Sequence, residues 1–126
     1  MIVNQKKIMV ISNNGASPWL KRIADGLGML GKLTVLPECG LAALDEPEEP
    51  YEIMLLDASG LEMELAERVA WLHGRFPQTP IVVLTSSPTW RRARAVLQAG
   101  ASDYVRRSME IDALLERCRS LMSWSP

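Results

Sequence analysis

The sequence predicts an α/β fold, in which a parallel sheet of five strands carries helices on both faces. Five short apolar segments of strand length are spread along the 126 residues. Segments with apolar residues at helical spacing alternate with them. Polar residues follow the strands at the ends where α/β proteins place their functional groups. Such alternation requires right-handed crossovers between parallel strands, and the length favours a single domain over residues 1–126.

The first strand and helix have the clearest pattern. Lys7–Ile11 is a nearly continuous apolar run, as expected for a strand buried on both faces. Ser17 is the expected N-cap of the next helix, with Pro18 at its first position, and Gly31 ends that helix. A second short strand is predicted at Lys32–Leu36. The inward positions of the helix are Leu20, Ile23, Ala24, Leu27 and Leu30.

The segment between the second and third strands has the weakest pattern. A short helix is predicted at Gly40–Leu44, and the acidic, proline-interrupted stretch Asp45–Pro50 is predicted to be an exposed loop. The third strand is Tyr51–Asp57, which ends in an acid. A helix is then predicted over Leu61–His73. Its buried positions are Leu61, Leu65, Val69 and Leu72.

Two further pairs of strand and helix complete the predicted domain. The fourth strand is Ile81–Thr85, followed by a helix with Ser87 as N-cap and Pro88 at its first position. Gly100 ends this helix, and Ser102–Arg106 is the fifth strand. The positions expected to face inward are Ala93, Val96 and Leu97 in the first of these helices, and Ile111, Leu114, Leu115, Cys118, Leu121 and Met122 in the last helix, which Ser108 caps.

Composition and charge exclude several classes of protein. Apolar residues make up 48% of the chain and charged residues 23%, which is ordinary for a globular domain. No apolar run approaches the ~20 residues of a membrane span, and no signal-peptide pattern is present, so we expect a cytoplasmic protein without membrane contact. Cys39 and Cys118 are then expected to be reduced thiols, with Cys118 in the core. The net charge is −1, so we expect no direct contact with nucleic acid.

Polar residues at the strand ends form the candidate site. The carboxyl ends of parallel strands share one edge of the sheet. A lone Asp at such an end is usually a turn former or a helix cap, but an Asp between hydroxyls and a guanidinium is a more specific arrangement. The residues predicted at this edge are Ser12 and Asn13 after the first strand, Asp57 at the end of the third, Thr85 and Ser86 at the fourth, and Arg107 after the fifth.

These segments resemble the receiver domains of response regulators in two-component signalling. The resemblance covers essentially the whole chain and is carried by "YEIMLLD", "PIVVLTSS" and "AGASDYVRRS". It implies a flavodoxin-like (βα)5 architecture, a doubly wound sheet of five parallel strands in the order 2-1-3-4-5. It also implies that Asp57 is the phospho-acceptor position, Thr85 the switch hydroxyl and Tyr104 the switch aromatic. Arg107 stands where the family has a lysine.

The pocket departs from the family pattern. Ser12 and Asn13 stand where the family has the acidic pair that holds Mg²⁺, a cation that favours carboxylate oxygens. Asp57 would be the only carboxylate, so we expect weak or absent Mg²⁺ binding and assign no cofactor and no metal ligand. We expect Arg107 to pair with Asp57 in place of the missing cation, although its planar fork differs from a lysine. Ser108 replaces the family's proline, so we expect a trans bond before it.

Two signalling functions are compatible with these residues. In the one that we favour, the chain is a non-enzymatic receiver-like domain of a phosphorelay that acts by protein–protein interaction, with weak or absent Mg²⁺-dependent phosphorylation at Asp57. In the alternative, a histidine kinase switches the domain at Asp57. A third interpretation is a small-molecule-binding flavodoxin-like module, in which residues 12–15 hold an anion at a helix N-terminus. It is the least favoured, because their spacing matches no phosphate-binding pattern.

A partner-binding face is predicted in the second half of the chain. Trp90 lies in the first turn of the helix after the fourth strand, beside Arg91 and Arg94, and Arg106 ends the fifth strand. In receivers this helix, the fifth strand and the last helix form the usual partner-binding and dimerising face. We therefore expect this face to contact a signalling protein or a second copy of the chain. The alternative is that Trp90 packs only on arginine side chains.

Overall fold

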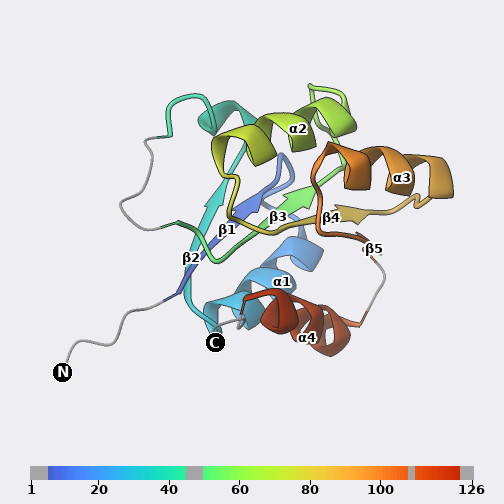
Figure 1. Cartoon of the computed structure of the whole chain (residues 1–126). Helices are drawn as coiled ribbons and strands as arrows, with labels where there is room; N and C mark the ends of the chain where they lie inside the picture. The colour runs from blue at the N-terminus through green and yellow to red at the C-terminus, as the bar shows by residue number, and fades with distance from the viewer. Residues whose placement is uncertain (1–5, 45–49, 108–109, 123–126) are drawn as a thin grey trace.

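A computed structural model, which describes residues 6–44, 50–107 and 110–122, has the predicted α/β fold. Its centre is one sheet of five parallel strands in the order β2-β1-β3-β4-β5 (Figure 1). This order is the one that the alternation and the resemblance predict. The strands are β1 Lys7–Ile11, β2 Lys32–Leu36, β3 Ile53–Asp57, β4 Ile81–Thr85 and β5 Asp103–Arg106.

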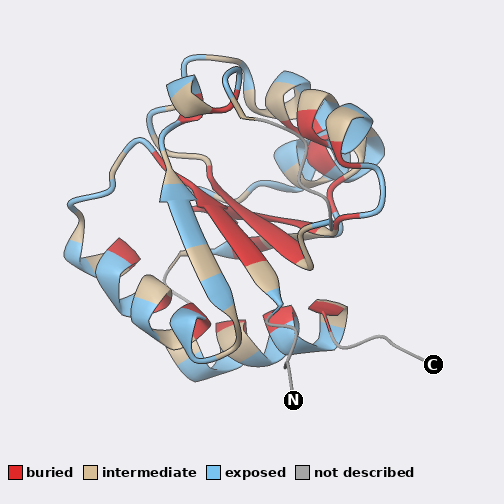
Figure 2. Cartoon of the chain, turned by 90° about the vertical axis from the view of Figure 1, so that its left-hand side faces the viewer, coloured by how far each residue is buried: buried red, intermediate tan, exposed pale blue. Residues whose placement is uncertain are grey.

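Helices cover both faces of the sheet (Figure 1). α1 Pro18–Gly28 and α4 Ile111–Met122 lie on one face, and α2 Leu65–Arg75 and α3 Trp90–Ala99 lie on the other. The central strands are buried, whereas β2 is exposed at the edge (Figure 2). Alternate strand residues therefore build two cores, one under each pair of helices.

The connection from β2 to β3 differs from the prediction. A 3-10 helix at Glu38–Gly40 replaces the short helix predicted at Gly40–Leu44. The turn forms early because the backbone N–H of Glu38 donates to the Asn13 side chain at 2.9 Å, which ties the end of β2 to the end of β1. Residues 45–49, most of the predicted exposed loop, lie outside the described part of the chain.

Helix α2 begins at Leu65 rather than at Leu61. The Glu64 side chain accepts a hydrogen bond from the N–H of Glu67 at 3.1 Å and so caps the helix at this point. The four residues before the helix are irregular and follow a turn at residues 59 and 60. Of the positions expected inside, Val69 and Leu72 are buried. Leu61 and Leu65 are half-buried.

Helix α3 begins two residues later than predicted. Its N-cap is Thr89, whose hydroxyl accepts a hydrogen bond from a backbone N–H of the first turn at 3.2 Å, so Ser87 and Pro88 precede the helix. Leu97 was expected inside but is 48% exposed. Val96 takes the inward position. Because adjacent residues lie about 100° apart around a helix, Leu97 is turned away from the core.

Several local predictions are confirmed. α1 begins at Pro18 with Ser17 at the N-cap position. Gly100 follows α3 with a φ of 123°, a conformation that L residues rarely adopt. Cys118 is buried in the core and is a free thiol. Ser108, the predicted cap of the last helix, and the peptide bond before it lie outside the described residues.

Candidate functional site

Asp57 ends β3 and is fully buried, at 0% exposure. Its carboxylate accepts three hydrogen bonds from neutral donors. Oδ2 accepts from Ser12 Oγ at 2.8 Å and from Asn14 Nδ2 at 3.3 Å, and Oδ1 accepts from the N–H of Ser59 at 3.1 Å. Both carboxylate oxygens are therefore occupied by groups of this chain, none of which carries a charge.

Asn14 belongs to this pocket, although the sequence did not single it out. Its Nδ2 also donates to the carbonyl of Ser59 at 3.0 Å, and its N–H donates to Ser12 Oγ at 3.0 Å. The loop after β1 is thus joined to the loop after β3 directly over Asp57. The signal available in the sequence was its place in the polar loop, immediately after two predicted pocket residues.

Arg107 does not pair with Asp57, so this expectation was wrong. Its guanidinium lies over the ring of Trp19, 4.1 Å from the centroid, and Trp19 Nε1 donates to the carbonyl of Arg107 at 2.8 Å. In the part of the chain that the structure describes, no ion pair joins Arg107 to an acid. A planar guanidinium stacks well on an indole, and neutral donors already occupy both oxygens of Asp57.

Asn13 turns away from Asp57, which it was predicted to accompany. Its Oδ1 accepts from the N–H of Glu38 at 2.9 Å. Its Nδ2 donates to Glu38 Oε1 at 3.2 Å and to the carbonyl of Gly60 at 2.9 Å. The side chain thereby links three loops at the carboxyl edge of the sheet, and its oxygen is not directed at Asp57.

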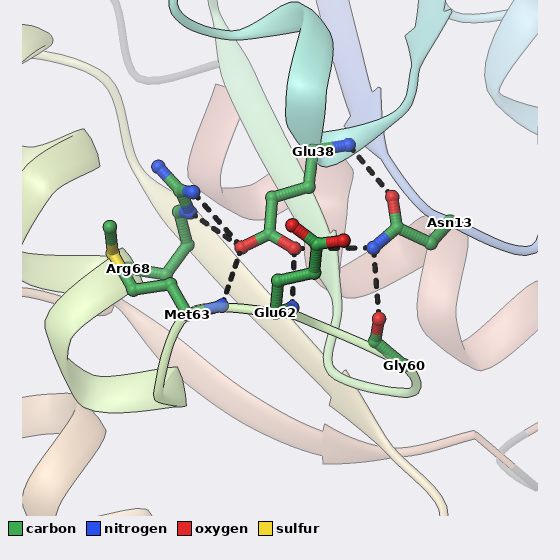
Figure 3. Close-up of polar contacts among 6 residues, drawn as sticks. All are labelled: Asn13, Glu38, Gly60, Glu62, Met63 and Arg68. Carbon is green, nitrogen blue, oxygen red and sulfur yellow. Dashed lines mark hydrogen bonds and ion pairs between the residues drawn. The ribbon is translucent and has the colours of Figure 1, made fainter.

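A buried carboxylate that the sequence did not reveal, Glu38, completes this linkage. It is 4% exposed, and its Oε1 accepts from the N–H of Glu62 at 2.7 Å. Its Oε2 accepts from the N–H of Met63 at 3.1 Å and from Arg68 Nε and Nη2, each at 3.0 Å (Figure 3). We call this set of residues the Glu38 clamp: Asn13, Glu38, Gly60, Glu62, Met63 and Arg68.

The clamp keeps Glu38 ionised. Burial raises the pKa of its carboxyl, but the hydrogen bonds from Glu62, Met63, Arg68 and Asn13 outweigh this effect and hold the pKa below its ordinary value. Glu62 and Met63 belong to the loop between Asp57 and α2, so a permanent charge fixes the loop that follows Asp57.

The two predicted switch residues lie near this edge on β4 and β5. Thr85 is 4% exposed, and its Oγ1 accepts from the N–H of Ser87 at 3.2 Å. Ser86 is exposed. Tyr104 is half-buried against the core under α2 and α3, and its hydroxyl is buried without a hydrogen-bond partner among the described residues. The aromatic side chain is therefore turned inward, toward the core under α2 and α3.

The outer surface of α3 exposes large apolar side chains. Trp90 is 69% exposed, and Leu97 lies two turns further along the same helix. The guanidinium of Arg91 lies 5.8 Å from the Trp90 ring centroid, so the predicted packing on an arginine exists but leaves most of the indole in solvent. Arg94 and Arg106 are exposed.

Among the described residues, no group of three or more His, Cys, Asp and Glu side chains could hold a metal ion. None of the described helices is long and apolar enough to cross a membrane. The donors around Asp57 also do not fit Mg²⁺, because one carboxylate is present and its oxygens accept from a hydroxyl and two N–H groups.

Comparison with solved structures identifies the fold. The response regulator DrrB from Thermotoga maritima, an OmpR/PhoB homologue, has a TM-score of 0.77 and 22% identity, over 92% of this chain and 52% of its own. A CheY-like receiver domain protein from Methanospirillum hungatei has a TM-score of 0.80 and 21% identity, over 94% of each chain. An atypical orphan response regulator, described with a phosphorylation-independent regulatory mechanism, has a TM-score of 0.75 and 18% identity, over 94% of this chain and 97% of its own.

The chain therefore has the fold of response-regulator receiver domains. It spans about half the length of the DrrB chain that it matches, at 52%. No family model matches the sequence, and a search of curated proteins finds no significant match.

Proposed function

We propose that this chain is a cytoplasmic, receiver-like signalling domain of a two-component system that acts by protein–protein interaction, with weak or absent phosphorylation at Asp57. One observation carries the proposal: the Asp57 carboxylate is fully buried and accepts hydrogen bonds from Ser12, Asn14 and Ser59, with no cation beside it among the described residues. Each oxygen of this carboxylate is hydrogen-bonded within the chain, which supports a pocket that is stable without a metal ion or a phosphoryl group.

The chemistry of phosphoryl transfer supports the proposal. Catalysis of this step depends on positioning and on cations that neutralise the charge on the transferring group. Here Ser12 replaces a carboxylate that would hold Mg²⁺, and Arg107 lies on the Trp19 ring rather than beside Asp57. A phosphoryl group on Asp57 would add about −1.5 to −2 charge to a buried site with only neutral donors.

The Glu38 clamp adds to this argument. A receiver switches when a modification biases two conformations of its loops. In this chain Glu38 binds the backbone of Glu62 and Met63 and pairs with Arg68, which supports a loop held in one conformation without modification. Tyr104 is turned inward in this state, and we infer that the domain presents one constant surface to its partners.

The partner-binding surface in this proposal is the outer side of α3 with the edge strand β5. Trp90 supplies an exposed aromatic anchor with Arg91 over its ring, and the exposed Arg94 on α3 and Arg106 on β5 add positive charge. A histidine kinase or another signalling protein is the expected partner, and a second copy of the chain is the alternative occupant.

A functional phospho-switch at Asp57 is the second candidate, because Thr85 and Tyr104 retain the two switch positions of the family. Treatment with acetyl phosphate and Mg²⁺, followed by intact-mass measurement, separates the two. We expect the wild-type chain to remain unlabelled and the double variant Ser12→Asp with Arg107→Lys to gain label, which Asp57→Asn should abolish. Stoichiometric labelling of Asp57 in the wild-type chain would establish the phospho-switch instead.

The interaction surface needs its own test. Proteins captured by the wild-type chain are compared with those captured by Asp57→Asn and by Trp90→Ala. We expect Asp57→Asn to retain the wild-type partners and Trp90→Ala to lose them. Loss of the partners with Asp57→Asn alone would contradict phosphorylation-independent binding.

A further inference from the structure

A second candidate site lies beside the Asp57 pocket, in a cleft between the loop after β3 and the start of α3. Its volume is about 330 Å³, within the range of roughly 300–1,000 Å³ found for small-molecule sites. Residues 58, 59, 61 and 63–66 form one wall. The end of β4, the loop that follows it and α3 form the other.

The cleft has apolar walls. Leu61 and Leu65 line it from the α2 side, and Ala95 and Val96 line it from α3. Val96 is buried, and the two leucines are half-buried although they lie beside an open space. A ligand with an apolar body would cover them and gain the usual free energy of burying apolar surface.

The same cleft contains hydrogen-bond donors that have no acceptor within the described residues. The guanidinium of Arg92 forms no ion pair and no ring contact there, unlike those of Arg68 and Arg107. Thr85 is buried, and its hydroxyl accepts from the N–H of Ser87 but donates to no described group. A buried hydroxyl proton and an exposed, unpaired guanidinium that line one cleft favour an anionic acceptor.

The charge on the ligand is limited by Glu64, which also lines the cleft. Its carboxylate accepts from the N–H of Glu67, so it remains in place as the cap of α2. With one cation and one anion along its walls, the cleft matches a single negative charge better than a multiply charged phosphate.

We propose that this cleft binds a small monocarboxylic acid, with its carboxylate at Arg92 and Thr85 and its apolar body between Leu61 and Val96. Such a ligand would provide the domain with a non-covalent input beside the Asp57 pocket. The site goes beyond the proposed function, because its occupation depends neither on phosphorylation nor on a partner protein.

Binding of hexanoate to the full chain, followed by amide NMR shifts, tests the proposal. Hexanamide and inorganic phosphate are the comparison probes. We expect saturable shifts with hexanoate, concentrated in residues 58–66 and 85–96, and binding weaker by about tenfold or more with hexanamide, which lacks the charge. Arg92→Gln should weaken hexanoate binding to a similar extent, and Arg22→Gln, at an exposed position of α1 outside the cleft, should leave it unchanged.

A second variant guards against indirect effects. Ala95 is exposed on α3, so Ala95→Phe should fill the cleft, abolish the hexanoate shifts and leave the unfolding temperature near that of the wild-type chain. The proposal is overturned by the absence of saturable shifts up to about 10 mM, by equal binding to Arg92→Gln, or by phosphate shifts as large as those of hexanoate, which would show an adventitious ion only. None of these outcomes depends on labelling of Asp57, so failure here is distinguishable from failure of the proposed function.

Discussion

Replacing Glu38 by Gln tests the clamp that holds the loop after Asp57. The substitution keeps the shape of the side chain but removes the charge shared by Arg68 and two backbone N–H groups. Arg68 is 12% exposed and would become a nearly buried cation without its partner. Removing one member of a buried pair costs about 3–5 kcal/mol. Because Arg68 retains its contact with Trp71, at 5.2 Å from the ring centroid, we expect the lower end, about 3 kcal/mol.

Thermal and urea unfolding, followed by circular dichroism, measure this loss. For a domain of this size, about 3 kcal/mol corresponds to a decrease in Tm of roughly 10 °C. Glu116→Gln is the matched control, because it breaks a surface pair with Arg119 whose side chains are 68% and 58% exposed. That control should cost under about 1 kcal/mol. A loss for Glu38→Gln no larger than for Glu116→Gln would refute the assigned contribution of the clamp.

The same variant should alter how stability depends on pH. The pKa of Glu38 in the folded chain lies below its ordinary value of 4.5. Its contribution is therefore fully present above the unfolded pKa and is lost as the pH falls through the folded pKa. The difference in unfolding free energy between wild type and Glu38→Gln should consequently shrink as the pH is lowered below 4.5. A difference that grows on acidification would contradict the lowered pKa.

Other measurements address the metal, the arginine stack and the core thiol. Mg²⁺ titration of the wild-type chain should show no saturable sub-millimolar binding at Asp57, and such binding would disprove this expectation. Ser12→Asp adds a second carboxylate and should introduce Mg²⁺ binding. Trp19→Phe should lower the free energy of unfolding in urea by about 1 kcal/mol, because it removes the hydrogen bond from Nε1 to the carbonyl of Arg107. An unchanged free energy would mean that this hydrogen bond does not contribute to stability. Burial, with a smaller effect from a nearby acid, raises the pKa of Cys118 to about 11. A thiol reagent at pH 8 should therefore label the exposed Cys39 at once and Cys118 only on unfolding. Equal labelling rates for the two thiols would contradict the buried state of Cys118.

The sequence was sufficient for the sheet because each central strand is an uninterrupted apolar run bounded by polar residues. The sequence was less informative about where each helix begins, because several residues near the start can serve as the N-cap. Only the hydrogen bond formed in the folded chain determines which residue does. Glu64 and Thr89 were selected over the predicted positions for this reason. These differences shift the start of two helices and leave the topology unchanged.

The site was predictable in position but not in contacts. The shared edge of a parallel sheet places Ser12, Asp57 and Thr85 together whatever their side chains do. Glu38 could not be found in this way, because it follows a proline in a segment without periodicity and its partners lie 24 to 30 residues away in sequence. The pairing expected between Arg107 and Asp57 was wrong for a related reason: the ring of Trp19 competes with the acid for the guanidinium.

The polar residues after β1 can be understood together with these contacts. Acids at positions 12 and 13 beside Asp57 would place three carboxylates in one small pocket, and their mutual repulsion would require a cation. With Ser12 and Asn14 the same loop instead donates hydrogen bonds to Asp57, and Asn13 is free to bind Glu38. The residues from which we expect weak or absent Mg²⁺ binding are therefore the same ones that form hydrogen bonds within the pocket. On this argument, Ser12→Asp should weaken the resting pocket in the absence of a cation, because it replaces the hydroxyl that donates to Asp57 by a second carboxylate, and the clamp and the Asp57 hydrogen bonds are parts of one connected set of loops.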